Sequence, residues 1–322
     1  MKTLKINRTI FINSIFLLLL IFACNPYAGL QEETTTRGKI KIGVDESMYL
    51  LSEAELYTFQ SIYTNAHITP IYKPEQDLMD ELLNDSLRKK DSLRIFITTR
   101  QLTKNEESYL NGKYIYPVTS PIAYDAVAFI VNLKSKDTLL KYNVIENIFK
   151  GKIKYWNEID KNNNSGKINV VFDNLKSSNV RYIKETFKID SFPKNCFVAT
   201  KNEEVINYVE KNSNAIGVIG VNWISDTQDS LTRNFLNRIK VVAVTPTYDP
   251  EGEDYYKPYQ AYVANKSYPF TRVVYIINRE SFTGLGSGFT AFVSGDQGQR
   301  IVRRMGMVPA TMPVRIVKLT KK

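Results

Sequence analysis

KYIYPVTSPIAYDAVAFIVN, residues 113–132, is the stretch on which the arrangement of the chain depends. Its first part alternates as a strand does, and 126–131 is a continuous apolar run typical of a buried strand. Strands are mostly about 3 to 10 residues long, and the ring nitrogens of Pro117 and Pro121 cannot donate to a neighbouring strand. The stretch therefore predicts two strands, joined at 120–124, that carry the chain from one lobe to another.

Before this crossing, strand and helix patterns alternate. Strands are predicted at 39–44, 67–72 and 93–98, and helices at 53–63, at 74–87 and after Thr103, which has the spacing of a capping box with Glu106. Such alternation predicts a parallel sheet with helices on its faces. In these sheets ligands lie beyond the carboxyl ends of the strands, which here are 45–47, 73–75 and 98–100.

After the crossing, a second alternation predicts a second lobe. Its elements are helices at 143–149, 178–187 and 203–209 and strands at 168–172 and 215–221. The apolar run 239–244, followed by Pro246, predicts a return crossing. A strand at 272–278, helices at 284–293 and 297–305 and a strand at 314–319 complete the chain. The predicted fold is α/β with two lobes, 39–120 with 246–322 and 121–245, joined by a hinge of two segments.

The N-terminus has the features of an export signal. Lys2, Lys5 and Arg8 precede the apolar run 15–23, which is too short to span a bilayer as a helix. The run ends at Cys24 in a pattern that resembles the bacterial lipoprotein processing site. That resemblance implies a signal peptide at 1–23, lipidation of Cys24 and a polar tether at 24–38. A plain export signal with an incidental Cys24 is the alternative. With Cys24 lipidated, Cys196 has no partner and the fold holds without a disulfide.

The composition is that of a folded protein with a basic surface. The 322 residues are 43% hydrophobic and 24% charged, with a formal net charge of +10. A basic balance is compatible with an anionic ligand, membrane or nucleic acid. The lysines are scattered rather than gathered into a stripe, which favours a solvated surface and gives no sign of nucleic-acid binding.

No catalytic or metal constellation is found in the sequence. His67 is the only histidine, so the usual zinc sites cannot form, and neither a G-x-S-x-G elbow nor a glycine-rich phosphate loop is present. We therefore expect no enzyme, no metal and no cofactor. Ser177, Ser178 and Asn179 stand at a predicted helix start, where free backbone N–H groups favour an anion, with Arg181 in the first turn. Simple N-capping by Ser177 or Ser178 is the alternative.

Four stretches together resemble the PstS-like family, the phosphate-binding substrate-binding proteins of ABC transporters. They are 122–132; 148–159, with the order Ile-Phe-x-Gly-x-Ile-x-x-Trp; 215–220; and 284–309, which ends Gly298-Gln299 to Gly306-x-x-Pro309. The similarity covers residues 39–319. It implies the periplasmic-binding-protein architecture, in which two lobes, each with a mixed, mostly parallel sheet flanked by helices, close on an oxyanion.

The resemblance also implies the ligand residues and the partners. In this resemblance Arg100 balances the negative charge of the bound anion, and the other ligand residues donate hydrogen bonds to it. The implied ligand residues are Ser47, Thr98, Thr99, Arg100, Ser177, Ser178 and Asn179. The ligand is phosphate or a similar small anion, and the partners are an ABC transporter permease and, through the lipid anchor, the extracytoplasmic face of a membrane. The protein is expected to be a monomer in the cell envelope.

Acidic residues at the strand ends motivate a second hypothesis. Asp45, Glu46 and Glu75 lie where an anion would bind and would repel it. The same scaffold would then serve as an envelope sensor or interaction protein that no longer binds phosphate. Asp125, just past the proline-containing segment, is expected to hold the hinge rather than the ligand.

Overall fold

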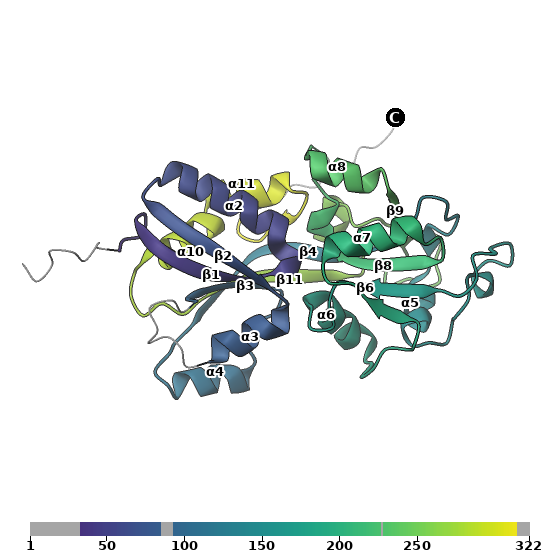
Figure 1. Cartoon of the computed structure of the whole chain (residues 1–322), viewed down its shortest axis with the longest axis horizontal. Helices are drawn as coiled ribbons and strands as arrows, with labels where there is room; N and C mark the ends of the chain where they lie inside the picture. Colours follow the sequence, from purple (N-terminus) through teal and green to yellow (C-terminus); the bar gives the residue numbers. More distant parts are fainter. Residues whose placement is uncertain (1–32, 85–92, 227, 314–322) are drawn as a thin grey trace, which may run out of the picture. The chain divides into compact units, whose positions relative to one another are not determined.

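The structure, a computed structural model, describes residues 33–84, 93–226 and 228–313 (Figure 1). Within these residues ten strands form one sheet, along which the order is β2-β1-β3-β11-β4-β8-β6-β7, with β9 and β12 also paired to β4. β5 and β10 form a separate pair. The bounds are β1 Gly38–Asp45, β2 Ala66–Lys73, β3 Ile95–Thr98, β4 Val118–Asn132, β5 Leu139–Leu140, β6 Asn169–Phe172, β7 Cys196–Val198, β8 Ala215–Gly220, β9 Ile239–Val241, β10 Ala243–Val244, β11 Thr271–Asn278 and β12 Val308–Pro309.

We call the part of the sheet built from β1, β2, β3 and β11 the first half, and the part built from β6, β7, β8 and β9 the second half. β1 pairs in parallel with β2 and β3, because helices α2 and α3 carry the chain between these strands. β6 pairs in parallel with β7 and β8, whereas β4 and β11 run antiparallel to their neighbours. The mixed α/β fold confirms the predicted fold class.

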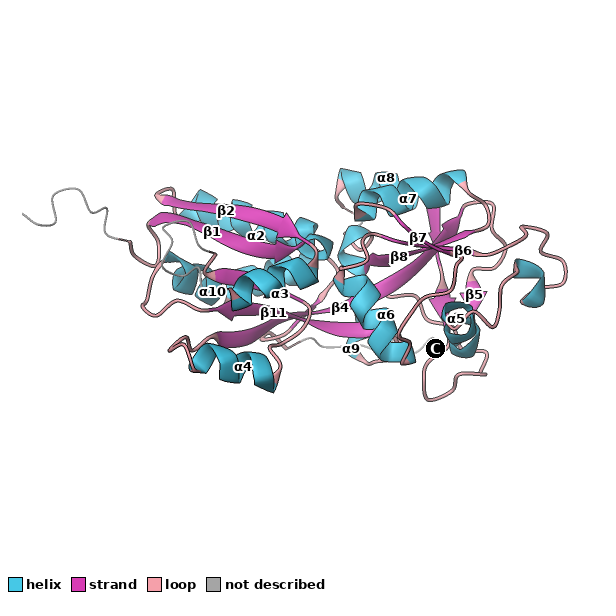
Figure 2. Cartoon of the chain, turned by 60° about the horizontal axis from the view of Figure 1, so that its bottom comes forward, coloured by secondary structure: helices cyan, strands magenta, loops and turns pink. Residues whose placement is uncertain are grey.

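Helices cover both halves of the sheet (Figure 2). The capping box predicted at Thr103 is present, with Glu106 N–H donating to Thr103 and the Glu106 carboxylate accepting from the Thr103 N–H. In the described part of the chain, short 3-10 turns lie between strands and helices at η1 Glu46–Met48, η3 Trp156–Glu158 and η4 Val221–Trp223. The helices are α2 Tyr49–Ile62, α3 Glu75–Leu83, α4 Lys104–Asn111, α5 Tyr142–Phe149, α6 Ser178–Phe187, α7 Asn202–Lys211, α8 Ser230–Leu236, α9 Gln260–Ala264, α10 Leu285–Ser294 and α11 Asp296–Arg304.

Separate hydrophobic cores support the two halves. In the first half, Ile42 of β1 packs in one cluster with Phe59 of α2 and Phe289 of α10. In the second half, Phe129 of β4 packs in another with Phe149 of α5 and Phe187 of α6. Gly217 of β8 allows a close approach, because a Cβ there would lie 2.8 Å from Ile130 and from Val205 of α7.

β4 corrects the prediction for residues 113–132, because it is one strand of 15 residues rather than two joined strands. Its first part pairs with β11 and its last part with β8 and β9, so one strand crosses from half to half. Pro121 is tolerated because β4 has β11 on one side at this position and, among the described residues, no strand on the other. The register shifts beside it, leaving Ile122 as an extra residue whose carbonyl accepts from Gln299.

The return crossing also lies elsewhere than predicted. Residues 239–244 stay in the second half, where β9 pairs with the end of β4 and β10 with β5. Val263, Tyr268 and Phe270 are buried in the second core, although the prediction assigns 246–322 to the first lobe. The chain returns at 270–272, where the Val127 N–H donates to the Phe270 carbonyl at 2.9 Å and β11 begins.

Several predictions fall on residues outside the described ranges. They are the signal peptide 1–23, Cys24 with most of the tether, the end of the helix predicted to 87 and the strand predicted at 314–319. None of the described helices has the length and apolarity needed to cross a membrane.

Candidate functional site

Arg272, the second residue of β11, joins the two halves of the sheet. Its Nη1 donates to Ser178 Oγ at 3.1 Å and to Asn179 Oδ1 at 3.0 Å, and its Nη2 donates to Ser47 Oγ at 3.3 Å. The two serine hydroxyl oxygens lie 3.0 Å apart. Ser47 lies in η1 beyond the end of β1, whereas Ser178 and Asn179 open α6. We call Arg272, Ser47, Ser178 and Asn179 the Arg272 cluster.

Asp125 of β4 balances the charge of Arg272. The two residues are direct partners in the β4–β11 register, and Arg272 Nε and Nη2 lie 2.9 and 2.8 Å from Asp125 Oδ2. Both side chains are almost completely buried, at 2% and 0% exposure. Burial raises the pKa of Asp125, although the positive charge of Arg272 works against that rise. Asp125 thus holds the crossing strands together through Arg272.

Ser47 is held from the second half through its backbone as well. Its carbonyl accepts from Asn222 Nδ2 at 2.6 Å and from Trp223 Nε1 at 3.2 Å, both from η4. Its N–H donates to Asp45 Oδ1 at 3.0 Å. The donors and acceptors around Ser47 therefore bring η1, α6, β11 and η4 into one buried polar network.

The start of α6 carries its own carboxylate. Asp173 Oδ1 accepts from Ser177 Oγ at 2.6 Å, and Asp173 Oδ2 accepts from the Nδ2 groups of Asn179 and Asn202, each at 3.1 Å. The Ser177 hydroxyl also accepts from the Val180 N–H, so Ser177 is the N-cap. Of the three side chains that the sequence predicts as anion donors here, Ser177 and Asn179 are therefore bonded to Asp173, whereas Ser178 contacts Ser47 and Arg272.

A second carboxylate occupies the donors at the end of β3. Glu75, the first residue of α3, accepts at Oε1 from the Thr99 N–H (2.7 Å) and the Thr99 hydroxyl (2.9 Å). Arg181 of α6 donates to Glu75 Oε2 at 2.5 Å and to Thr99 Oγ1 at 2.9 Å. Burial opposes ionisation of Glu75, but the charge and hydrogen bond of Arg181, with the Thr99 donors, outweigh it and lower its pKa. The Glu75–Arg181 ion pair is therefore a second link between the two halves.

Two other predicted ligand residues point away from the Arg272 cluster. Arg100 forms a two-pronged ion pair with Glu106 of α4, with both N–O distances at 2.8 Å. The hydrogen bonds from Arg100 lower the pKa of Glu106 to about 2. The Thr98 hydroxyl donates to the Arg100 carbonyl at 2.8 Å. Arg100 does line a cavity of about 480 Å³ between α3 and α6, together with Glu75, Ser177 and Arg181.

Acidic residues beside the cluster hold their protons unusually strongly. Burial, with the negative charge of Glu75, raises the pKa of Asp45 to about 7. Burial, with the negative charge of Asp173, raises the pKa of Glu46 to about 7. The Glu46 carboxylate accepts from Asn202 at 2.5 Å. Asp45 and Glu46 therefore change charge near neutral pH.

A family model described as the PBP superfamily domain matches residues 30–297. The chain belongs to this family. In this chain the Arg272 cluster lies at the junction between the two halves of the sheet. In the described residues no group of three or more histidine, cysteine or acidic side chains is arranged to hold a metal ion.

Curated relatives of this PBP superfamily chain are named as phosphate-binding proteins PstS. The one from Staphylococcus epidermidis is 27% identical over 209 residues, which are 62% of this chain and 59% of the relative. The one from Borreliella burgdorferi is 22% identical over 224 residues, 67% of this chain and 72% of the relative. The chain thus spans 59% of the length of the staphylococcal protein.

Solved structures share the fold. A candidate phosphate ABC transporter substrate-binding protein from Clostridium perfringens, with bound phosphate, superposes with a TM-score of 0.70 at 21% identity, covering 85% of this chain and 100% of that one. An ABC-type phosphate transport receptor from Vibrio cholerae gives a TM-score of 0.61 at 18% identity, covering 85% and 100%. These relatives are named as binding proteins and receptors rather than as enzymes.

Arg272 was not among the ligand residues predicted from the sequence. Ser47, Ser178 and Asn179 come together around it, whereas Arg100, the arginine that was predicted, binds Glu106. A signal was present in the sequence. Asp125 and Arg272 are opposite charges, each beside an apolar run in a predicted strand. When two strands run side by side between the halves and each carries one charged residue next to an apolar run, opposite charges on them indicate a buried ion pair.

Proposed function

We propose that the protein is an extracytoplasmic binding protein that captures a small oxyanion, phosphate in the first instance, and passes it to an ABC importer. The observation that carries this proposal is the Arg272 guanidinium in contact with hydroxyls from both halves of the sheet. A guanidinium and hydroxyls are donors suited to a tetrahedral oxyanion. The names of the curated relatives support the choice of phosphate.

The proposal includes two lobes that part and close. The separate cores support a division into 33–125 with 271–307, and 126–270 with Val308. In this structure Ser47 Oγ and Ser178 Oγ are in hydrogen-bond contact at 3.0 Å, which leaves no space for phosphate between them. Entry of the anion therefore requires the lobes to separate, and capture is their closure around it. No covalent bond is made or broken.

Asp45 would make capture depend on pH. With a pKa of about 7, its carboxyl is neutral in mildly acidic solution and charged above neutrality. A neutral carboxyl can donate a hydrogen bond to an oxyanion, whereas a carboxylate repels it. Phosphate binding is then expected to weaken as the pH rises through about 7.

Calorimetric titration of the purified chain with phosphate tests the proposal. We expect saturable binding, and about ten-fold weaker binding for Ser178→Ala, which corresponds to one lost hydrogen bond of about 1.4 kcal/mol. Ser294→Ala is the matched control, because this buried hydroxyl has no hydrogen-bond partner among the described residues and lies outside the site. Absence of both heat and a thermal shift with phosphate would contradict the ligand assignment.

A second function is favoured by Asp173 and Glu75. These carboxylates already accept from the donors at the start of α6 and at Thr99, where an anion would bind. The scaffold would then act as an envelope sensor or interaction protein without phosphate. Three observations together would support this second function over the first. They are donors fully occupied by these carboxylates, no phosphate binding, and a specific partner recovered from the envelope.

The cellular setting is part of the same proposal. Cys24 is proposed to carry the lipid that anchors a monomeric protein to the membrane, where a permease receives the ligand. Mass spectrometry of protein isolated from membranes tests this, because lipidation adds acyl mass to an N-terminal Cys24. A mature protein that starts elsewhere and leaves with the soluble fraction would favour the plain export signal.

A further inference from the structure

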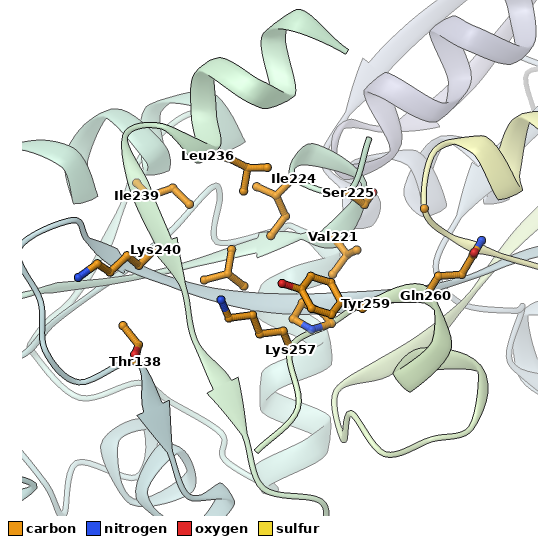
Figure 3. Close-up of a pocket in the computed structure, with 13 residues that line it drawn as sticks. Thr138, Val221, Ile224, Ser225, Leu236, Ile239, Lys240, Lys257, Tyr259 and Gln260 are labelled. Carbon is orange, nitrogen blue, oxygen red and sulfur yellow. The ribbon is translucent and has the colours of Figure 1, made fainter. Parts of the chain in front are cut away.

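A cavity of about 610 Å³ lies apart from the Arg272 cluster and shares no residue with it. Its walls come from η4, the end of α8, β9 and the segment before α9 (Figure 3). The volume falls in the range of about 300–1,000 Å³ that holds small organic ligands. The cavity is therefore large enough for a molecule well beyond the size of phosphate.

One part of this cavity is apolar. Leu236 and Ile239 stand near Ile224, and Val221 lies below them in the same view (Figure 3). Val221, Ile224 and Ile239 are largely buried in the second core, so these walls are supported from behind. Contact with such walls favours a hydrocarbon body over a hydrated ion.

Two lysines supply the charge of the cavity. Lys240 donates to the Ser135 carbonyl at 2.9 Å, a bond that leaves its positive charge unbalanced. Among the described residues, the Lys257 ammonium has no hydrogen bond or ion pair, and no carboxylate lines the cavity. Elsewhere in the described residues a cavity of similar size, between α3 and α6, balances its arginines and lysines with acids.

We propose that this cavity binds an amphiphilic carboxylate, with its hydrocarbon body against Leu236 and Ile239 and its carboxylate at Lys257. The Lys240 ammonium points away from these walls (Figure 3) and adds positive charge at the edge of the cavity. The apolar walls account for the body and the uncompensated lysines for the head. Residues 314–322 of the chain itself are a poor match, because they carry Arg315, Lys318, Lys321 and Lys322, of the same charge as the cavity. This site shares no residue with the Arg272 cluster, although η4 borders both.

Calorimetry of the full chain with three ten-carbon probes tests the head group first. We expect decanoate, below its micelle concentration, to bind with one-to-one stoichiometry, decanol at least ten-fold more weakly and decyltrimethylammonium not at all. Equal binding of decanoate and decanol would overturn the role of the lysines. No binding of decanoate would overturn the site. This comparison needs no variant.

Charge variants then locate the binding. We expect Lys257→Gln to weaken decanoate at least ten-fold, and Lys257→Glu to abolish decanoate binding and to admit decyltrimethylammonium. Lys161→Gln is the matched control, since it removes the same charge from an exposed lysine outside the cavity. Unchanged decanoate affinity in Lys257→Gln, or an equal loss in Lys161→Gln, would overturn the placement. Thermal unfolding of each variant confirms that it is folded.

Discussion

The Arg272 cluster and the Lys257 cavity are both cationic, yet they differ in what surrounds the charge. Arg272 is bonded to Asp125 and to side-chain oxygens from both halves, so its charge and its donors are satisfied within the chain. Lys257 stands beside apolar walls with no acid among the residues that line its cavity. Arg272 links the two halves in the contact seen here and would meet an anion only where the halves part, whereas the partly buried Lys257 can meet a ligand without such a movement.

The largest effect expected from this comparison is on stability. Arg272→Met leaves Asp125 buried without its partner and should lower the free energy of unfolding by about 3–5 kcal/mol. Lys257→Met breaks no interaction within the described residues and should stay within about 0.5 kcal/mol. Urea unfolding measures both. Similar free energies of unfolding for the two variants would contradict the claim that only Arg272 is needed for the stability of the fold.

A smaller loss is expected at the second link between the halves. Glu75→Gln weakens the charged bonds to Arg181 and Thr99, and should cost about 2 kcal/mol. Glu185→Gln is a control on the same arginine, because Glu185 binds Arg181 at 2.7 Å but is 61% exposed. An exposed pair contributes little, so this variant should lose at most about 0.5 kcal/mol. Equal losses in urea unfolding would show that burial does not set the contribution of Glu75.

The smallest effect expected is on the pH dependence of stability. The pKa of Asp45 is raised to about 7, so its contribution is fully present below its unfolded value and is lost as the pH rises through about 7. Between pH 5 and 7, the free energy of unfolding of the wild type should therefore fall as the pH rises. In Asp45→Asn that slope should be shallower by about 1 kcal/mol per pH unit. Lys257→Met should keep the wild-type slope. Urea unfolding at intervals across this pH range gives the slopes. An unaltered slope in Asp45→Asn would contradict a raised pKa of Asp45 in the folded protein.

Local patterns were sufficient to predict the strands β1 to β3 of the first half, the helices between them and the strand ends. Thr103 and Glu106 form a capping box through bonds within one turn, and 45–47, 73–75 and 98–100 follow strands that pair in parallel. The approach of Glu75 to Thr99 follows from that topology, because both lie at the carboxyl ends of these strands. These features depend on short-range periodicity and on the chirality of strand–helix–strand units, which a single sequence carries.

Long-range pairing could not be predicted in the same way. Arg272 looks like the polar residue of an alternating strand, and only its register opposite Asp125 buries it. The ion pair of Arg100 with Glu106 was also not predicted, because it depends on where α4 packs. The two prolines suggested a break in β4, but within the described part of the chain no strand pairs with one side of Pro121, so its missing donor is harmless. In each case the deciding partner is remote in sequence or set by packing.

The continuity of β4 has a mechanical consequence. A strand of 15 residues that changes partners at 126–127 is an elastic element shared by both halves, unlike a loose loop. Any rotation of one half against the other twists β4 and the backbone that runs beside it at 270–272, and the twist is resisted by the ladders on either side. In the proposed opening, β4 would therefore resist the parting of the halves and favour their return to contact.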